Sequence, residues 1–424
     1  MITTISLFFL FLLLGVPISF VILAASGIGI WEAGSNLVIL AQQMFAGMNN
    51  YTMLAVPFFI ISGDIAAKGD TSQRLIDVIN AFMGRLRGGL GIATIITCVF
   101  FGAITGSSMA TVVAVGGLML PKLLERKYPR SLSLGIIASA GTIGVMIPPS
   151  VPMVMICLAM GTSVGEQFTA GFVPGFLLAG AFCVYTWFFA KKNNIPLEPK
   201  VSWGEKFKIL KKSFFSLMFP VIVLGGIYSG LTTPTEAAVV SVFYVMLVEL
   251  FINRSLTLRE MYKIVSKSVV DAAALTMTIA TAQVFVWYMT TEKIPEMLYN
   301  FLISNVSSGF ILLILLAVLF LIVGCFTNVV TVVIILGPIL LGALNYFGVD
   351  LIHFGIIAVL MSQIGFLTPP FGLCLFVTMK TARSSMAEVV KAAMPFLIIM
   401  LLMCILFILV PQISTFLPDL IYGG

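Results

Sequence analysis

The feature that most constrains the fold is a series of apolar runs about as long as a membrane is thick. Clear examples cover residues 5–31, 168–189, 215–228 and 394–410. A helix needs roughly 20 apolar residues to cross a bilayer. Only 9% of the 424 residues are charged, whereas a soluble domain carries about 25%. The sequence therefore predicts an all-α polytopic membrane protein.

The first of these runs, 5–31, is expected to be a retained membrane span. No basic residue precedes it, and it is longer than the hydrophobic region of a signal peptide.

The six cysteines lie in apolar segments without metal-ligand spacing, and the single histidine, His353, has no companion. These residues are therefore interpreted as parts of the core.

The basic residues predict the topology. They gather in the clusters 68–87, 122–130, 191–212, 254–267 and 380–391. Placing every cluster in the cytoplasm obeys the positive-inside rule and leaves only Lys293 outside. This assignment requires 89–121 and 307–341 each to enter and leave the membrane on one face. It also predicts a cytoplasmic N-terminus and a periplasmic C-terminus, and it explains the net charge of +6 without nucleic-acid binding.

Three pairs of matching segments indicate an internal duplication. The string TVVAVGG at 111–117 matches TVVIILG at 331–337, a shift of 220 residues. Residues 135–138 match 355–358 at the same shift, and the glycine and double proline of 143–149 match 364–370 one residue later. Because the two hairpins are predicted to enter from opposite faces, the repeats are expected to be inverted, as in many secondary transporters.

The repeat divides the chain into two halves on one plan. Repeat 1 is predicted at 1–190, with a hairpin at about 89–121 and a broken helix at about 131–162. A basic cytoplasmic linker, 191–213, is followed by repeat 2 at 214–424, with a hairpin at about 307–341 and a broken helix at about 354–379. An amphipathic stretch, 71–87 or 292–305, precedes each hairpin and is expected to lie along the membrane surface.

The hairpin tips are candidate ion and substrate sites. The tips FGAITGSSM (101–109) and GCFTN (324–328) place helix-breaking residues in the middle of apolar runs. Non-helical backbone at membrane depth is tolerated only where protein or a water-filled cavity satisfies it. Carbonyl and hydroxyl oxygens there suit sodium, and half-helix N-termini suit a carboxylate. The alternative is that glycine and serine only allow close helix packing.

The predicted broken helices carry equivalent breaks. Residues 144–152 and 365–370 each combine a glycine with a double proline. Proline frees a carbonyl one turn earlier, near Gly144 or Gly365, so each break is expected to offer oxygens to its own hairpin tip. The alternative is a plain kink.

Three acids lie close to the ends of predicted spans. Glu236 begins one span, Asp64 ends another and Asp271 begins a third. Carboxylates within a membrane are usually functional, but at span ends a capping role is an equal alternative. Glu236 is the candidate functional acid, and the other two are weaker candidates.

The sequence offers no catalytic arrangement. It contains no GxxxxGK[ST], HExxH or GxSxG motif. Neither an enzyme nor an ATP-driven pump is predicted, and no cofactor beyond Na⁺ as a coupling ion is expected.

Over essentially its whole length the sequence resembles the large membrane subunit (DctM type) of tripartite ATP-independent periplasmic (TRAP) transporters. The resemblance rests on SGDIA (62–66), FGAITGSS (101–108), IPPSVP (147–152), PTE (234–236) and TPP (368–370). It implies a bacterial inner-membrane, elevator-type importer of organic anions such as sialic acids or C4-dicarboxylates, driven by sodium. It also implies a small four-helix membrane subunit and a periplasmic substrate-binding protein as partners.

The resemblance also implies roles for particular residues. The first sodium site would comprise Thr105, Ser107, Ser108, Gly144 and Pro148. The second would comprise Gly324, Thr327, Asn328, Gly365 and Thr368. Substrate would lie between the tips, contacting Ser107 and Asn328. Because no lysine or arginine falls in the apolar core, neutralising an anion requires backbone dipoles, sodium or a residue at the rim.

Two alternatives remain. The first is a stand-alone divalent anion/sodium symporter of similar build, which would work without a binding protein. The second is an intramembrane enzyme or a channel. An enzyme would need a nucleophile–base pair or a metal cluster at membrane depth, and the sequence contains neither. A channel would show no substrate-coupled sodium uptake.

Overall fold

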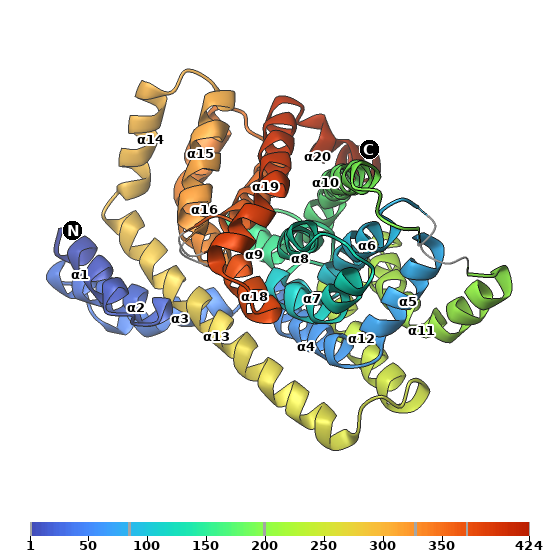
Figure 1. Ribbon diagram of the computed structural model, residues 1–424. Helices are drawn as coiled ribbons and strands as arrows, with labels where there is room; N and C mark the ends of the chain where they lie inside the picture. The colour runs from blue at the N-terminus through green and yellow to red at the C-terminus, as the bar shows by residue number, and fades with distance from the viewer. Residues whose placement is uncertain (1, 84–85, 198–200, 326–328, 370–371, 424) are drawn as a thin grey trace.

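The protein is helical throughout the part of the chain that the structure describes. The computed structural model covers residues 2–83, 86–197, 201–325, 329–369 and 372–423, and within these ranges it has no strand (Figure 1). Seven of the described helices are long and apolar enough to cross a membrane, or eight if one bent pair counts as a single span. The prediction of an all-α polytopic membrane protein is confirmed.

The helices follow one another with short connections. The first half contains α1 (Ile2–Leu13), α2 (Ile18–Glu32), α3 (Val38–Met48), the 3₁₀ turn η1 (Tyr51–Leu54), α4 (Ala55–Lys68), α5 (Thr71–Met83), α6 (Gly89–Thr105), α7 (Ser108–Glu125), α8 (Arg130–Ile143), the 3₁₀ turn η2 (Gly144–Met146), α9 (Val151–Met160) and α10 (Val164–Lys192). The second half contains α11 (Trp203–Tyr228), α12 (Pro234–Leu247), the π-helical turn η3 (Val248–Ile252), α13 (Leu258–Thr291), α14 (Ile294–Asn305), α15 (Gly309–Gly324), α16 (Val329–Tyr346), α17 (Leu351–Gly365), α18 (Leu373–Ala382), α19 (Met386–Leu409) and α20 (Gln412–Tyr422).

The prediction of one continuous span at 5–31 is wrong. The apolar run contains two helices, α1 and α2, joined by a turn around Gly15 and Pro17. Gly15 has a φ of 75°, which only glycine adopts readily. Pro17 precedes α2 with no N–H to continue a helix. Hydropathy shows the length of an apolar run but not a reversal inside it.

The two helices of this turn run antiparallel, as contacts with α13 show. The Thr4 hydroxyl of α1 lies 3.2 Å from the Tyr288 hydroxyl, whereas Ser19 of α2 lies 2.8 Å from the Thr278 hydroxyl. Thr278 and Tyr288 are roughly 15 Å apart along a helix. The chain therefore starts beside the C-terminal end of α13, away from that helix's basic beginning, and the α1–α2 turn lies near its middle.

The hairpins α6–α7 and α15–α16 open at opposite ends of α10, a helix of 29 residues. At the C-terminal end of α10, a Cβ placed on Gly91 of α6 would lie 2.9 Å from Thr186. At its other end, the Gln167 amide donates to the Ile352 carbonyl, close after α16. Cytoplasmic placement of the basic clusters requires each hairpin to enter and leave the membrane on one face, and hairpins that open at opposite ends of α10 are compatible with that requirement.

The connection between the halves is shorter than the predicted linker 191–213. Helix α10 continues to Lys192, and α11 begins at Trp203. A capping box begins α11, because Ser202 accepts from the Glu205 backbone while the Glu205 carboxylate accepts from Ser202. The basic side chains at 206–212 therefore belong to the first turns of a helix rather than to a loop.

Helix α5 connects α4 to the first hairpin, and a buried carboxylate fixes its beginning. The Glu249 side chain is fully buried and accepts from the backbone N–H groups of Asp70 and Thr71 at 3.1 and 2.9 Å. The hydroxyl groups of Thr71 and Ser255 also donate to it. A carboxylate at this position satisfies donors that α5 leaves unpaired at its N-terminus.

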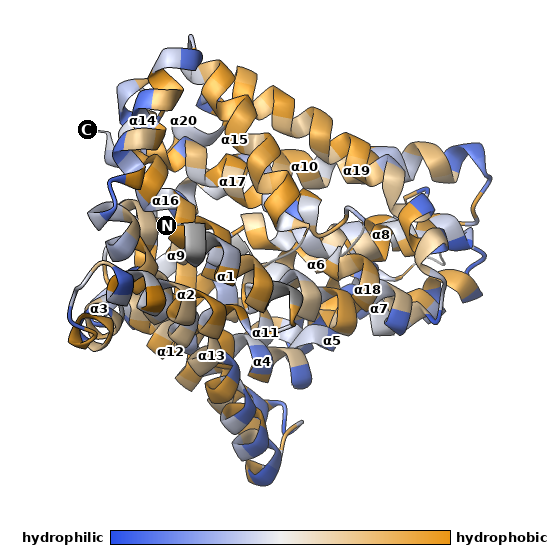
Figure 2. Cartoon of the chain, turned by 90° about the vertical axis from the view of Figure 1, so that its left-hand side faces the viewer, coloured by the Kyte–Doolittle hydropathy of each residue, from blue (hydrophilic) through white to orange (hydrophobic). Residues whose placement is uncertain are grey.

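Polar residues gather at helix ends and connections, whereas the helix midsections are apolar (Figure 2). All six cysteines are free, and no cluster of potential metal ligands occurs in the described ranges. His353 lies in the core, where its Nδ1 is 2.6 Å from the Ser414 hydroxyl of α20. Cysteines and histidine thus pack as structural residues.

Candidate functional site: the first hairpin tip at a central cavity

The first hairpin reverses direction through a short polar turn. Gly106 has a φ of 61° at the end of α6, a left-handed conformation that favours glycine. The Ser107 hydroxyl then accepts from the Ala110 N–H at 3.3 Å and caps α7. Thr111 donates to the Ser107 carbonyl at 2.8 Å, and the Ser107 N–H donates to the Thr105 hydroxyl at 3.3 Å. Local hydrogen bonds thus hold Thr105 and Ser107 at the tip.

The break between α8 and α9 lies against this tip, and the two helices meet at 45°. A Cβ on Gly102 would lie 2.5 Å from the Gly144 Cα, and one on Gly106 would lie 3.1 Å from the Val151 nitrogen. The Gly144 carbonyl accepts from Ile147 at 3.2 Å and keeps a second lone pair. Ser150, in the same break, has a buried hydroxyl without a hydrogen-bond partner in the described part of the chain.

The second half repeats this contact. A Cβ on Gly365, at the end of α17, would lie 2.6 Å from the Gly324 carbonyl carbon at the end of α15. The Gly365 carbonyl accepts from the Thr368 N–H at 3.0 Å, in the same i to i+3 pattern as in the first break. Thr327 and Asn328, predicted to contribute to the second sodium site, lie outside the described residues.

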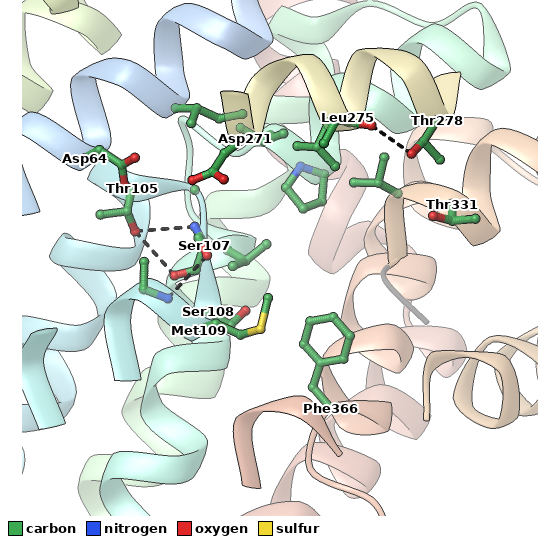
Figure 3. A pocket seen from close by; sticks show the side chains of 18 of the residues that line it. Asp64, Thr105, Ser107, Ser108, Met109, Asp271, Leu275, Thr278, Thr331 and Phe366 are labelled. Atoms are coloured by element: carbon green, nitrogen blue, oxygen red, sulfur yellow. Dashed lines mark hydrogen bonds between the residues drawn. The ribbon is translucent and has the colours of Figure 1, made fainter. Parts of the chain in front are cut away.

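The two halves meet around a cavity of about 670 Å³ (Figure 3), here called the central cavity. Its polar lining comes from the first tip (Thr105, Ser107, Ser108), from α17 (Gln363), from the start of α16 (Thr331) and from α13 (Thr278). The Ser108 hydroxyl donates to the Gln363 side-chain oxygen, and both residues are buried. This bond ties the tip of the first hairpin to the broken helix of the other half.

Charged residues from neighbouring helices line the same cavity. Asp64 of α4 and Asp271 of α13 lie on one side (Figure 3), and Lys267 lines the cavity one turn before Asp271. The Asp64 carboxylate accepts from the Ser268 hydroxyl at 2.6 Å. A basic residue at the rim was one of the three sources of positive potential that the sequence analysis named for neutralising an anion, and Lys267 is such a residue. It belongs to α13, whereas Thr105, Ser107 and Ser108 belong to the first hairpin.

Glu236 has a different place. Its carboxylate accepts from the Thr233 N–H and hydroxyl at 2.8 and 2.9 Å, which completes a capping box at the start of α12. Glu236 is exposed and is not among the residues that line the central cavity. The carboxylates at the cavity are those of Asp64 and Asp271, the weaker candidates of the sequence analysis.

The other predicted site residues are distributed unevenly. Thr105, Ser107 and Ser108 line the cavity directly. Gly144 and Gly365 lie behind it, where their backbones meet the hairpins. Thr368 lies beyond Gly365 and donates its hydroxyl to the Ile364 carbonyl at 2.8 Å. Pro148 lies in the break beside the first tip but is not among the cavity-lining residues.

Sequence reasoning missed Gln363, Lys267 and the α1–α2 turn, which reaches the cavity through Pro17–Ser19. A signal for Gln363 existed, since it is a polar amide in a largely apolar helix. Lys267 lies at the end of a basic cluster and looks like an ordinary topogenic residue. Nothing in the sequence alone separates the two roles.

Comparisons with known proteins support one family. Residues 5–413 match the model of the DctM component of the tripartite ATP-independent periplasmic transporters. The chain is 36% identical to the ectoine TRAP transporter large permease protein TeaC of Halomonas elongata, over 97% of each chain. It is 39% identical to the C4-dicarboxylate TRAP transporter large permease protein DctM of Pseudomonas aeruginosa, over 90% of this chain and 89% of the relative.

A solved structure supports the fold separately. The YdaH transporter of Alcanivorax borkumensis has a TM-score of 0.67 over 91% of this chain and 88% of its own, at 13% identity. That likeness concerns the fold alone. Large permeases of the DctM family are inner-membrane proteins that work with a small membrane subunit and a periplasmic substrate-binding protein. The chain belongs to the DctM family and is the large permease component of a TRAP transporter.

Proposed function

We propose that this permease couples sodium entry to the import of a carboxylate-bearing organic substrate by an elevator movement of its hairpins. The observation that carries the proposal is the central cavity, where the Ser108–Gln363 bond joins parts of the two inverted halves. Secondary transporters of inverted-repeat build bind substrate and ions at such a junction.

The sodium sites are proposed at the two glycine contacts. The first comprises Thr105, Ser107, Ser108, Gly144 and Pro148, and the second comprises Gly324, Thr327, Asn328, Gly365 and Thr368. Hard cations prefer oxygen ligands. Two observations support the first site: the Gly144 carbonyl has a spare lone pair, and Ser150 has a buried hydroxyl without a partner. Ser150 is therefore added as a proposed ligand.

The substrate is proposed to bear a carboxylate. The relatives named above are an ectoine permease and a C4-dicarboxylate permease, and carboxylate is the group that their named substrates share. A sialic acid meets the same description. Ser107 and Asn328 are proposed as contacts from the tips, and the ammonium group of Lys267 as the positive charge that faces the carboxylate.

The elevator movement would slide the hairpins along a surface formed by α4 and α13. At the contact between α4 and the first tip, a Cβ on Gly63 would lie 2.7 Å from the Thr105 Cα, so the two backbones touch. Helices α5 and α14 precede the hairpins and would act as arms. The basic beginning of α13 would face the cytoplasm. The start of α1, which lies beside the other end of α13, would then be periplasmic, whereas the sequence analysis expected a cytoplasmic N-terminus.

Reconstitution in liposomes tests the proposal. The chain, its small subunit and the binding protein would be assayed with ectoine, succinate and N-acetylneuraminate, with and without an inward sodium gradient. Uptake of one of these substrates is expected only with the gradient and the binding protein. Uptake indifferent to sodium would overturn the coupling, and uptake without the binding protein would favour a stand-alone symporter.

A further inference from the structure

A second cavity lies beyond the central cavity. It measures about 330 Å³ and is lined by the end of α3, by the connection after it and by α9, α13 and α16. Its polar side chains are all neutral amides: Asn49, Asn50 and Gln283. The central cavity, by contrast, is lined by two aspartates and a lysine.

The two cavities follow each other along the same three helices. Where the lining of the central cavity stops, that of the second begins: at Pro152 and Met155 on α9, Thr278 and Ile279 on α13, and Thr331 and Ile334 on α16. At 1.5 Å of rise per residue these steps span roughly 1.5–4.5 Å of helix. Along each of these helices, an advance of only one to three residues separates the two linings.

The side chains at this boundary, which we call the boundary layer, are apolar and buried. Met155, Ile279 and Ile334 line the second cavity on the side toward the central one, and their exposed fractions are 0, 6 and 7%. One side chain comes from each helix. An apolar constriction between two cavities with polar linings resists the passage of a charged solute, because the solute would lose its hydration there.

The order of the lining residues along α13 shows that the two cavities extend toward opposite ends of this helix. The central cavity extends toward the basic beginning of the helix through Lys267, whereas the second extends toward its other end through Gln283 and Val286. Under the positive-inside rule the central cavity faces the cytoplasm and the second cavity faces the periplasm.

Gln283 is the side chain best placed to meet a solute in the second cavity. It is half-buried and makes no hydrogen bond with any residue that the structure describes. Gly47 lets α3 approach it closely, since a Cβ there would lie 2.7 Å from the Gln283 Cβ. Asn50 is already engaged, because its side-chain oxygen accepts from the Thr52 N–H.

We propose that the second cavity is the periplasmic vestibule of the substrate pathway, in which the amides of Gln283 and Asn49 bind a substrate carboxylate. The layer of Met155, Ile279 and Ile334 closes this vestibule from the central cavity. The inference rests on the proposed function, since it assigns a second position to the same carboxylate-bearing substrate. Neutral amide donors bind a carboxylate more weakly than an ammonium group does, which suits a site of passage.

Cysteine accessibility tests the vestibule without any transport assay. The complex with Gln283→Cys would be treated in intact cells with the anionic, membrane-impermeant reagent 2-sulfonatoethyl methanethiosulfonate. The matched control is Ala280→Cys, a fully buried position on the same helix, and the parent protein gives the background of the native cysteines. Gln283→Cys is expected to react at least tenfold faster than Ala280→Cys, while Asp271→Cys reacts only in inverted vesicles. A Gln283→Cys as slow as Ala280→Cys would overturn the proposal.

Uptake kinetics test the contact with substrate. Gln283→Leu is expected to raise KM at least fivefold for the substrate identified in the liposome assay. Gln42→Leu, an exposed amide on α3 outside both cavities, should leave KM within twofold. Equal KM values for the two variants would exclude Gln283 as a binding residue. Sodium-coupled uptake by a protein whose Gln283→Cys is inaccessible would refute the vestibule alone, whereas sodium-independent uptake would count only against the proposed function.

Discussion

Gly102 and Gly144 touch backbone to backbone, where the first arm of the first hairpin crosses the break between α8 and α9. A Cβ on either residue would lie within 2.5 Å of the other's Cα. Gly324 and Gly365 make the corresponding contact in the second half. Each half thus joins its hairpin to its broken helix through a contact between backbones.

Gly102→Ala is expected to reduce uptake at least tenfold. The new methyl group would overlap backbone atoms of Gly144, which cannot move aside as a flexible side chain can, so α6 must shift from the break. Gly117→Ala is the matched control, because it lies on the other arm of the same hairpin with nothing within 4 Å of its Cβ. Uptake by reconstituted variants, corrected for the amount inserted, checks the prediction. Equal activity of the two variants would contradict it.

Gly365→Ala is expected to raise the sodium concentration for half-maximal uptake at least tenfold. The added methyl group would overlap the Gly324 carbonyl carbon at 2.6 Å and move the oxygens proposed for the second sodium site. Gly342→Ala on α16 serves as control, since its nearest neighbour is a Tyr299 ring atom at an ordinary 3.7 Å. Sodium titrations of uptake separate the two. An unchanged sodium dependence in Gly365→Ala would move the second ion site elsewhere.

The repeat and its hairpins could be predicted because they depend on residue types that are recognisable within a short stretch of sequence. Glycines and double prolines break helices wherever they occur, and the clusters around Lys122 and Lys191 fix which loops share a side. The spacing between such residues can be read directly from the sequence. Gly102 and Gly144, which touch in the structure, both lie in segments that contain such residues.

The rest depends on contacts between distant segments. Ser108 and Gln363 are 255 positions apart, and nothing in the sequence around either residue indicates that the two form a hydrogen bond. Lys267 and Glu236 both lie near span ends, where a cavity, a helix cap and the lipid interface are equally compatible with the sequence. The reversal at Gly15 was missed because the apolar run around it is long enough for a single span.

Glu249→Ala is expected to lower the melting temperature of the detergent-solubilised protein by several degrees. Its carboxylate is the common acceptor for Thr71, Asp70 and Ser255, and unpaired buried donors cost about 1–3 kcal/mol each. Glu236→Ala removes an exposed cap and should change both melting temperature and uptake little. Thermal unfolding monitored by intrinsic fluorescence provides the measurement. A strong loss of uptake in Glu236→Ala with an unchanged melting temperature would restore it as a functional acid.

Lys267→Met is expected to raise the substrate KM about tenfold with little change in kcat. The substitution keeps an unbranched apolar stem but removes the positive charge that the lining of the central cavity contains; a hydrogen bond to a charged group contributes about 1.5–3 kcal/mol. Lys263→Met, exposed one turn earlier on α13 and outside the cavity, is the control. Initial uptake rates over a range of substrate concentrations decide, and a KM equal to that of Lys263→Met would exclude the contact.

The bond between Ser108 and Gln363 is expected to appear as coupling in a double-mutant cycle. Each residue is almost fully buried, so Ser108→Ala leaves the Gln363 oxygen without its donor, and Gln363→Leu leaves the Ser108 hydroxyl without its acceptor. Each single change should cost about 1–3 kcal/mol, while the double variant, which removes both polar groups, should cost less than the sum.

The same cycle applied to uptake separates a bond that only stabilises from one that controls the movement. In the elevator proposal the first hairpin and α17 move together, so losing the bond in either single variant should slow uptake at saturating substrate and sodium. The double variant, measured by thermal unfolding and by kcat, should then recover stability without recovering rate. Strictly additive losses in both measurements would show that the two side chains do not interact, and full recovery of kcat would assign the bond to folding alone.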